Sequence, residues 1–320
     1  MSGTGKHLFI QEVGTRDGFQ SEARFIPTAE KIALVDALSL CGLAKIEVTS
    51  FTSPKAIPAL ADADEVLRGI QRQPGVVYAA LVPNLRGAER AIAAGADELN
   101  LVMSASETHN LLNLRMTRAQ SVTRLLEVIA LAKTAGVALN VSLSTTFGCP
   151  MEGDVPEAVV LELAERFLDQ GVAGISLCDT TGMAHPGQVA SLCQTFRKRY
   201  PNAALTLHLH NTRGMGLANA LAGVEVGVDR FDASLGGIGG CPYAPGATGN
   251  VCTEDLVHLL QAMGQRVDVD LPRLLAAART LPGLLGHDVP GQVLHAGSSK
   301  ELHPVPASLE EIRTRALAQG

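Results

Sequence analysis

The strongest constraint on the fold is a regular alternation of short apolar runs with longer amphipathic segments along most of the chain. Runs that are rich in Val, Ile and Leu and nearly continuous in apolarity are typical of strands buried in a parallel sheet. Eight such runs cover residues 7–14, 45–51, 76–83, 98–104, 138–144, 174–181, 204–211 and 230–237.

Helical patterns separate these runs. The clearest spans residues 156–170, where Val160, Leu163, Ala164 and Phe167 recur on one helix face and Gly171 supplies a stop signal. Further helices are expected at residues 28–41, 62–71, 84–94, 118–135, 186–200, 215–226 and 253–263. Eight strands that alternate with helices predict an α/β fold, a (β/α)₈ TIM barrel. An open doubly wound sheet is the alternative, but no GxGxxG motif follows the first strand.

The alternation ends near residue 265. We therefore expect residues 1–265 to form a catalytic TIM-barrel domain and residues 266–320 to form a C-terminal helical extension packed on it. Two helices are expected in this extension, at residues 271–281 and 308–317. They would cover one end of the barrel or reach a neighbouring subunit, and we expect a homodimer or a higher homo-oligomer.

Composition narrows the class of protein. The chain of 320 residues has 26 Lys and Arg against 32 Asp and Glu, no Trp and only 3% aromatic residues, which argues against nucleic-acid binding. No apolar run is long enough for a membrane helix, and the first residues do not resemble a signal peptide. Six cysteines without a CxxC pair indicate reduced thiols. These features predict a cytoplasmic enzyme.

The sharpest motif is LTLHLHN at residues 205–211. His208 and His210 are two residues apart on a strand, so both side chains point to the same face. Two inward imidazoles form a metal-binding platform, which Asp17 at the end of the first strand could extend. The alternative is a pair of hydrogen-bonded histidines in the barrel core, but burying two imidazoles without partners is costly.

Two further motifs carry reactive groups. In VGTRDGFQ, Arg16 and Asp17 are adjacent at a strand end, so that the acid can bind a metal while the guanidinium faces a substrate oxygen. The alternative is an ordinary surface turn with an ion pair. The segment GGIGGCPYAPGATGN contains six glycines and Cys241. It predicts a mobile lid that brings a thiol over the site, or else a flexible connector with an inert cysteine.

Taken in order, the motifs of this chain resemble those of the 3-hydroxy-3-methylglutaryl-CoA lyase family. The resemblance covers about residues 8–265 and is carried by EVGTRDGFQSE, IEVTSFTSPKAIP, VPNLRGAERAIAAGA, FGCPMEG, ISLCDTTG, LHLHNTRGMGLAN and GGIGGCPYAPGATGNVCTEDLV. Each motif is modest alone, but the ordered set is highly specific.

The resemblance implies a TIM-barrel metallolyase that uses Mg²⁺ or Mn²⁺ and cleaves an acyl-CoA substrate to acetyl-CoA and acetoacetate, in leucine degradation and ketone-body formation. It implies that the metal ligands are Asp17, His208, His210 and Asn250. Arg16 would stabilise the enolate charge and Cys241 would lie on the catalytic lid. Glu47, Asp179 and Glu254 match positions that order the site in this family.

The chain also departs from the family pattern. Asn211 follows the second histidine where aspartate is common, and Arg213 replaces a tyrosine or similar residue. Ala23 and Arg24 stand where a lysine is frequent, and residues 106–116 replace a phenylalanine–lysine segment. These differences concern the acyl group and the coenzyme A contacts, and they leave the predicted metal ligands unchanged.

The residue chemistry agrees with a lyase. Cleavage of the C2–C3 bond of a 3-hydroxyacyl thioester needs a base for the 3-hydroxyl and a fixed positive charge for the enolate. His208 and Cys241 are candidates for the proton transfers, with Asp179 orienting, and Zn²⁺ or Co²⁺ could also occupy such a site. The alternatives are a lyase for another branched 3-hydroxyacyl-CoA, a Claisen condensing enzyme or aldolase of the same barrel, and a catalytically silent metal-binding scaffold.

Overall fold

The computed structural model describes residues 6–240 and 249–319 and contains a closed barrel of parallel strands. The barrel strands are β1 (His7–Glu12), β2 (Lys45–Ser50), β3 (Val77–Val82), β4 (Glu98–Ser104), β5 (Ala138–Ser144), β6 (Gly174–Asp179), β7 (Ala204–Leu209) and β8 (Arg230–Ala233). Each strand pairs with the next, and β1 pairs with both β8 and β2, which closes the sheet. The predicted TIM barrel is therefore confirmed.

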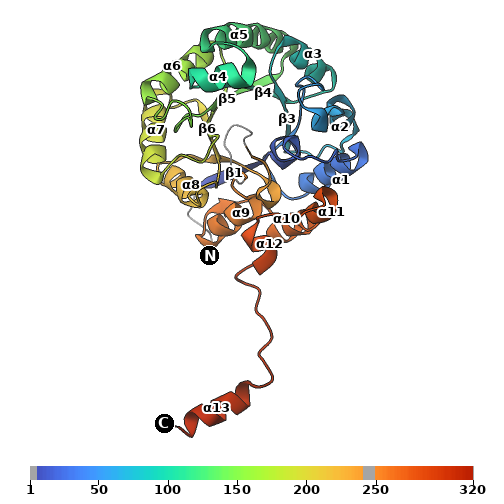
Figure 1. Ribbon diagram of the computed structural model, residues 1–320, viewed down its shortest axis with the longest axis vertical. Helices are drawn as coiled ribbons and strands as arrows, with labels where there is room; N and C mark the ends of the chain where they lie inside the picture. The colour runs from blue at the N-terminus through green and yellow to red at the C-terminus, as the bar shows by residue number, and fades with distance from the viewer. Residues whose placement is uncertain (1–5, 241–248, 320) are drawn as a thin grey trace.

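A ring of helices surrounds the barrel (Figure 1). Its members are α1 (Thr28–Ser39), α2 (Ala63–Gly69), α3 (Leu85–Ala93), α5 (Arg118–Ala135), α6 (Glu157–Leu168), α7 (Pro186–Arg199), α8 (Gly216–Glu225) and α9 (Thr253–Ala262). Helix α5 shows why the local sequence forms a helix there. Thr117 and Gln120 form a capping box at its start, and Gly136 ends it with a φ of 69°.

Within the barrel, the end of β8 and one short helix differ clearly from the sequence-based expectation. Strand β8 ends at Ala233 rather than near residue 237, because Gly236 and Gly237 adopt positive φ values of 67° and 70° and turn the chain. The short helix α4 (Glu107–Leu114) was not predicted. Its N-cap is Ser106, whose side chain accepts a hydrogen bond from the His109 amide.

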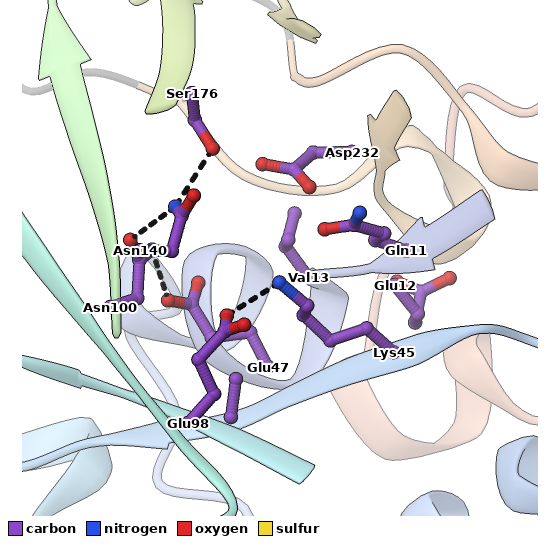
Figure 2. A pocket seen from close by; sticks show the side chains of 11 residues that line it. Gln11, Glu12, Val13, Lys45, Glu47, Glu98, Asn100, Asn140, Ser176 and Asp232 are labelled. Carbon is purple, nitrogen blue, oxygen red and sulfur yellow. Dashed lines mark hydrogen bonds and ion pairs between the residues drawn. The ribbon is translucent and has the colours of Figure 1, made fainter. Parts of the chain in front are cut away.

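The barrel has an apolar outside and a polar inside. On β7, Leu205, Leu207 and Leu209 are at most 2% exposed and belong to the hydrophobic core. The inward positions of other strands carry hydrogen-bonding side chains, as Figure 2 shows for Gln11, Lys45, Glu47, Glu98, Asn100, Asn140, Ser176 and Asp232. The apolar layer between sheet and helices is the main hydrophobic core, and these polar side chains fill the barrel interior.

The C-terminal segment begins with β9 (Arg266–Val267), which pairs with β1, and continues with α10 (Leu271–Ala278), α11 (Leu281–Leu285) and α12 (Gln292–Ala296). Of these elements, β9, α11 and α12 were not predicted. Leu274 and Leu281 of this segment are fully buried. Helix α13 (Leu309–Leu317) is exposed along its length and stands away from the barrel in Figure 1. The part of the predicted extension from residue 301 onwards therefore does not pack on the barrel. The division into two domains at residue 265 remains a prediction.

Within residues 6–240 and 249–319, no helix is both long enough and apolar enough to span a membrane.

We predict that a chain ending at Glu301 unfolds within about 2 °C of the full chain, because exposed surface residues contribute little to stability. The removed residues include Leu302 and Leu317, which are 91% and 77% exposed. Differential scanning calorimetry checks the melting temperature, and light scattering checks the molar mass. A larger drop, or a smaller assembly, would show that this segment packs against a partner.

Candidate active site

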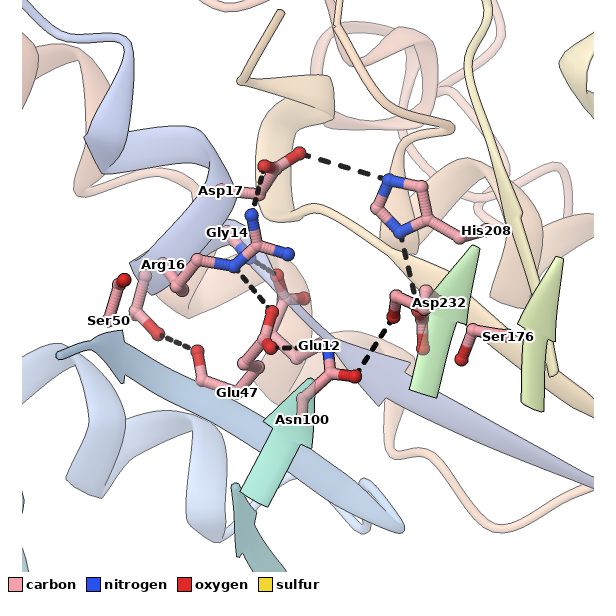
Figure 3. A network of polar contacts seen from close by, with 12 residues as sticks. Glu12, Gly14, Arg16, Asp17, Glu47, Ser50, Asn100, Ser176, His208 and Asp232 are labelled. Atoms are coloured by element: carbon pink, nitrogen blue, oxygen red, sulfur yellow. Dashed lines mark hydrogen bonds and ion pairs between the residues drawn. The ribbon is translucent and has the colours of Figure 1, made fainter. Parts of the chain in front are cut away.

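The predicted reactive residues meet at the carboxyl ends of the barrel strands. Arg16 and Asp17 lie on a single π-helical turn, Gly14–Gly18, that follows β1. His208 is on β7, and His210 lies just beyond its end, where it forms a bridge with Asn250. Closure of the barrel brings these segments together, although Asp17 and His208 are 191 positions apart in the sequence (Figure 3). Active sites of TIM barrels form at this end.

Asp17, His208 and His210 form a cluster of possible metal ligands. The Nε2 atoms of the two histidines are 3.3 Å apart, and Asp17 Oδ2 lies 3.9 Å from His208 Nε2. One ligand atom from each of the three residues lies within 4.8 Å of the others. Asn250 extends the cluster, since its Nδ2 donates to Asp17 Oδ2 at 2.8 Å.

The chemistry of this cluster fits a divalent cation. Asn250 Oδ1 is buried and has no hydrogen-bond partner among the residues that the structure describes. Burial, together with the neighbouring His208, lowers the pKa of His210 to about 3, so its imidazole stays neutral. Two imidazoles, a carboxylate and an amide oxygen are suitable ligands for such an ion, which would also screen the two facing nitrogen atoms from each other.

Asp17 is ionised although it is largely buried. Burial by itself raises its pKa, but the Arg16 guanidinium and the two histidines oppose this effect and lower the pKa to about 2. The carboxylate therefore carries its negative charge at all pH values at which the enzyme would work.

Asp232 is a site residue that the sequence analysis missed. Its Oδ2 lies 3.3 Å from His208 Nδ1. Burial lowers the pKa of His208, but the hydrogen bond and charge of Asp232 outweigh this, and the pKa is raised overall. With its Nδ1 proton donated to Asp232, His208 presents Nε2 to Asp17 and His210. The available signal was the strand alternation in RFDAS, which places Asp232 and Ser234 on the same face.

Arg16 is held between two carboxylates. It is 8% exposed, its Nε donates to Glu47 Oε2 at 2.5 Å, and its Nη1 donates to Asp17 Oδ1 (Figure 3). Glu47 comes from β2 and is itself 3% exposed. Within the described part of the chain, Nη2 of Arg16 has no hydrogen bond, so this nitrogen can meet an oxygen atom of a ligand.

Two other acids that the sequence analysis singled out, Asp179 and Glu254, bond to loop amides rather than to the ligand cluster. Asp179 Oδ1 accepts hydrogen bonds from the amides of Met183 and Ala184 at 2.7 and 3.1 Å, and burial raises its pKa to about 6. Glu254 accepts hydrogen bonds from the Gly236 amide. The structure thus places both carboxylates at the base of loops that border the site. A direct role of Asp179 in the reaction remains a prediction.

Cys241 and the central part of the predicted lid, residues 241–248, lie outside the described residues. Their role therefore remains a prediction. The described cysteines Cys41, Cys149, Cys178, Cys193 and Cys252 are free and buried.

Comparisons with known proteins identify the family of this chain. The HMGL-like family model matches residues 7–281. A hydroxymethylglutaryl-CoA lyase of Bacillus subtilis is 45% identical over 294 residues, which are 92% of this chain and 98% of that protein. An (R)-citramalyl-CoA lyase of Chloroflexus aurantiacus is 41% identical over 298 residues, covering 90% of this chain and 94% of that protein.

Among solved structures, an HMG-CoA lyase from Acinetobacter baumannii in complex with coenzyme A and 3-methylmalate is similar to this chain over most of its length. It superposes with a TM-score of 0.91 and 50% sequence identity, covering 96% of this chain and 100% of that one. The resemblance found in the sequence motifs is thus confirmed across the barrel, and the chain belongs to the HMGL-like family of lyases.

Proposed function

We propose that this protein is a divalent-metal-dependent lyase that cleaves 3-hydroxy-3-methylglutaryl-CoA to acetyl-CoA and acetoacetate. The observation that carries the proposal is the fixed guanidinium of Arg16 beside the Asp17–His208–His210 cluster. The names of the Bacillus subtilis and Acinetobacter baumannii relatives support this choice of substrate.

The reaction needs one proton removed and one delivered. When the 3-hydroxyl loses its proton, the oxygen electron pair forms the new carbonyl at C3 and the C2–C3 bond breaks. The bonding pair moves into a thioester enolate, and protonation of C2 then gives acetyl-CoA. A Mg²⁺ or Mn²⁺ ion bound by Asp17, His208, His210 and Asn250 would supply Lewis acidity toward the 3-hydroxyl oxygen.

Arg16 stabilises the enolate in this proposal. Negative charge develops on the thioester oxygen, and Nη2 of Arg16 is the donor without another partner in the described structure. Because Glu47 and Asp17 already hold the guanidinium, little reorganisation is needed when the charge forms. A preorganised donor of this kind contributes about 3–4 kcal/mol to the stabilisation of a transition state.

The proton transfers are assigned to His208 and Cys241, with Asp179 as the orienting acid. His208 lies at the cluster with Nδ1 against Asp232, so it would accept the proton at Nε2, in a step in which Nε2 is not bound to the cation. Cys241 is proposed on the sequence pattern of its loop alone.

A second substrate is supported by a specific observation, the similarity to (R)-citramalyl-CoA lyase over nine-tenths of this chain. Citramalyl-CoA has the same 3-hydroxy-3-methyl carbon as hydroxymethylglutaryl-CoA, but its free carboxylate is one carbon nearer to that carbon. The same residues could therefore cleave it, with pyruvate in place of acetoacetate. The cytoplasmic location, the homo-oligomeric state and a part in leucine degradation or ketone-body formation stay predictions.

The direct test is an assay of acetyl-CoA release from both acyl-CoA substrates. We expect hydroxymethylglutaryl-CoA to be cleaved to acetoacetate, EDTA to abolish the activity, and added Mg²⁺ or Mn²⁺ to restore it. Turnover of citramalyl-CoA alone would select the second substrate, and turnover that persists after complete metal removal would contradict the proposed site.

Arg16→Lys should lower kcat at least about 100-fold while the fold stays intact, because an ammonium group cannot keep the bonds to Glu47 and Asp17 and also reach the substrate oxygen. Steady-state kinetics with circular dichroism measure both properties. Arg166→Lys, on the exposed face of α6, is the matched control and should retain full activity. Near-normal kcat in Arg16→Gln would exclude Arg16 as the enolate donor.

Metal binding should depend on the protonation of His208. The pKa of His208 is raised, and its protonated form cannot bind a cation through Nε2. Mn²⁺ affinity should therefore fall as the pH drops through this pKa. Asp232→Asn removes the charge that stabilises the imidazolium and lowers the pKa. The pH midpoint of Mn²⁺ binding should then move toward acid.

Electron paramagnetic resonance of free Mn²⁺ between pH 5 and 8 measures this midpoint. Asp229→Asn is the control, since Asp229 lies close by in sequence but pairs with Lys6 near the surface. A midpoint that stays in place, or that moves toward alkaline pH, would show that Asp232 does not control His208.

A further inference from the structure

A chain of buried hydrogen bonds leads from Arg16 into the barrel interior. Glu47 Oε2 accepts from Arg16 Nε, and Glu47 Oε1 accepts from Asn100 Nδ2 at 2.7 Å. Asn100 Oδ1 in turn accepts from Asn140 Nδ2 at 3.0 Å and from Ser142 Oγ at 2.9 Å. Figure 2 shows the amides of Asn100 and Asn140 in line behind Glu47. The chain joins β2, β4 and β5.

We infer that Asn100 is a positioning residue for the reaction: it holds the Glu47 carboxylate in the one orientation that aims the Arg16 guanidinium at the substrate oxygen. The inference rests on the proposed role of Arg16 and extends it to a residue that touches neither substrate nor metal.

The bonds on Asn100 fix which way its amide faces. Its oxygen accepts from two donors, Asn140 and Ser142, so a flipped amide would place its NH₂ group against both of them. Asn140 is held as well, since its Nδ2 also lies 2.9 Å from Ser176 Oγ. The NH₂ group of Asn100 must therefore point to Glu47.

Glu47 has no freedom left once Asn100 is in place. One carboxylate oxygen bonds to Asn100 and the other to Arg16, so the orientation of the carboxylate sets the direction in which Arg16 Nε donates. A buried ion pair is sensitive to such support, because its attraction offsets desolvation only when the remaining lone pairs are satisfied. Asn100 and Glu47 are 8% and 3% exposed, so water can give little of this support.

A purely structural role would not need this set of groups. TIM-barrel interiors are commonly filled by branched apolar side chains, which pack without any requirement for hydrogen bonds. Here the interior positions behind Arg16 carry two amides and two hydroxyls. Asn100 donates to Glu47, and both Asn140 and Ser142 donate to Asn100. Asn140 is held in turn by its bond to Ser176.

The test exchanges the donor and the acceptor. Asn100→Asp replaces the NH₂ group by an oxygen of the same shape that repels Glu47, and we expect kcat to fall about 10- to 100-fold with KM within about threefold. The double variant Glu47→Gln with Asn100→Asp re-forms the bond with its direction reversed and keeps the total charge. The kcat of the double variant should be at least about tenfold higher than the kcat of Asn100→Asp.

Two controls separate positioning from stability. Tyr78→Phe removes a buried hydroxyl that bonds to Ser39 Oγ at 2.9 Å on the outer face of the sheet, so it should lower the melting temperature without changing kcat. Mn²⁺ affinity should stay within about threefold in Asn100→Asp, because the ligand cluster is not part of the amide chain. If Asn100→Asp does not fold, Asn100→Ala, which adds no charge, should still lower kcat at least about tenfold.

The inference is overturned if a folded Asn100→Asp enzyme keeps kcat within twofold of wild type, if the double variant is no faster than Asn100→Asp, or if Mn²⁺ affinity falls in parallel with kcat. All ratios are measured on whichever acyl-CoA the wild-type enzyme cleaves. The choice of substrate is therefore decided by the wild type alone, and the role of Asn100 by the variants.

Discussion

The buried guanidinium of Arg16 is the group on which the rest of the site depends. A cation at this depth is stable only if opposite charges lie against it, and Glu47 and Asp17 supply them from two different segments. Each of these carboxylates then needs further donors, which Asn100 and Asn250 provide. One buried charge thus accounts for much of the polar interior.

The same arrangement connects the guanidinium to the metal-ligand cluster. Asp17 bonds to Arg16 through Oδ1 and to Asn250 through Oδ2, so it is shared between the group that would stabilise the enolate and the group that would hold the cation. Asp17 therefore contacts both groups, and the adjacent positions 16 and 17 serve two different tasks.

A polar interior is possible because stability comes from elsewhere. The outward side chains of the strands, such as Leu207 and Phe231, are buried under the surrounding helices and form the continuous hydrophobic core. Side chains alternate along a strand, so one set of positions packs the core and the other set faces the barrel axis. The fold can then accommodate His208 and Asp232 on the inner face without loss of the outer packing.

The order of strands and helices follows from the amino-acid sequence alone, because periodic apolarity and glycine stops are local signals. The shared face of His208 and His210 and the place of Arg16 and Asp17 at a strand end follow from it as well. Helix α4 and the end of β8 were missed or misplaced, since an N-cap serine and two glycines with positive φ are weak signals beside apolar runs. Helix α13 was predicted as a helix, but its amphipathic pattern does not specify what it contacts, and it is exposed along its length.

Which polar residues act together depends on how the barrel closes. Glu47 and Asn100 are 53 positions apart, and His208 and Asp232 are 24 apart, so no local pattern links either pair. Barrel closure brings them within hydrogen-bonding distance, because the pairing of β1 with β8 and β2 sets the register of all the inward side chains. The chemistry of each side chain follows from its residue type, whereas the residue that it contacts is set by the register of the barrel strands.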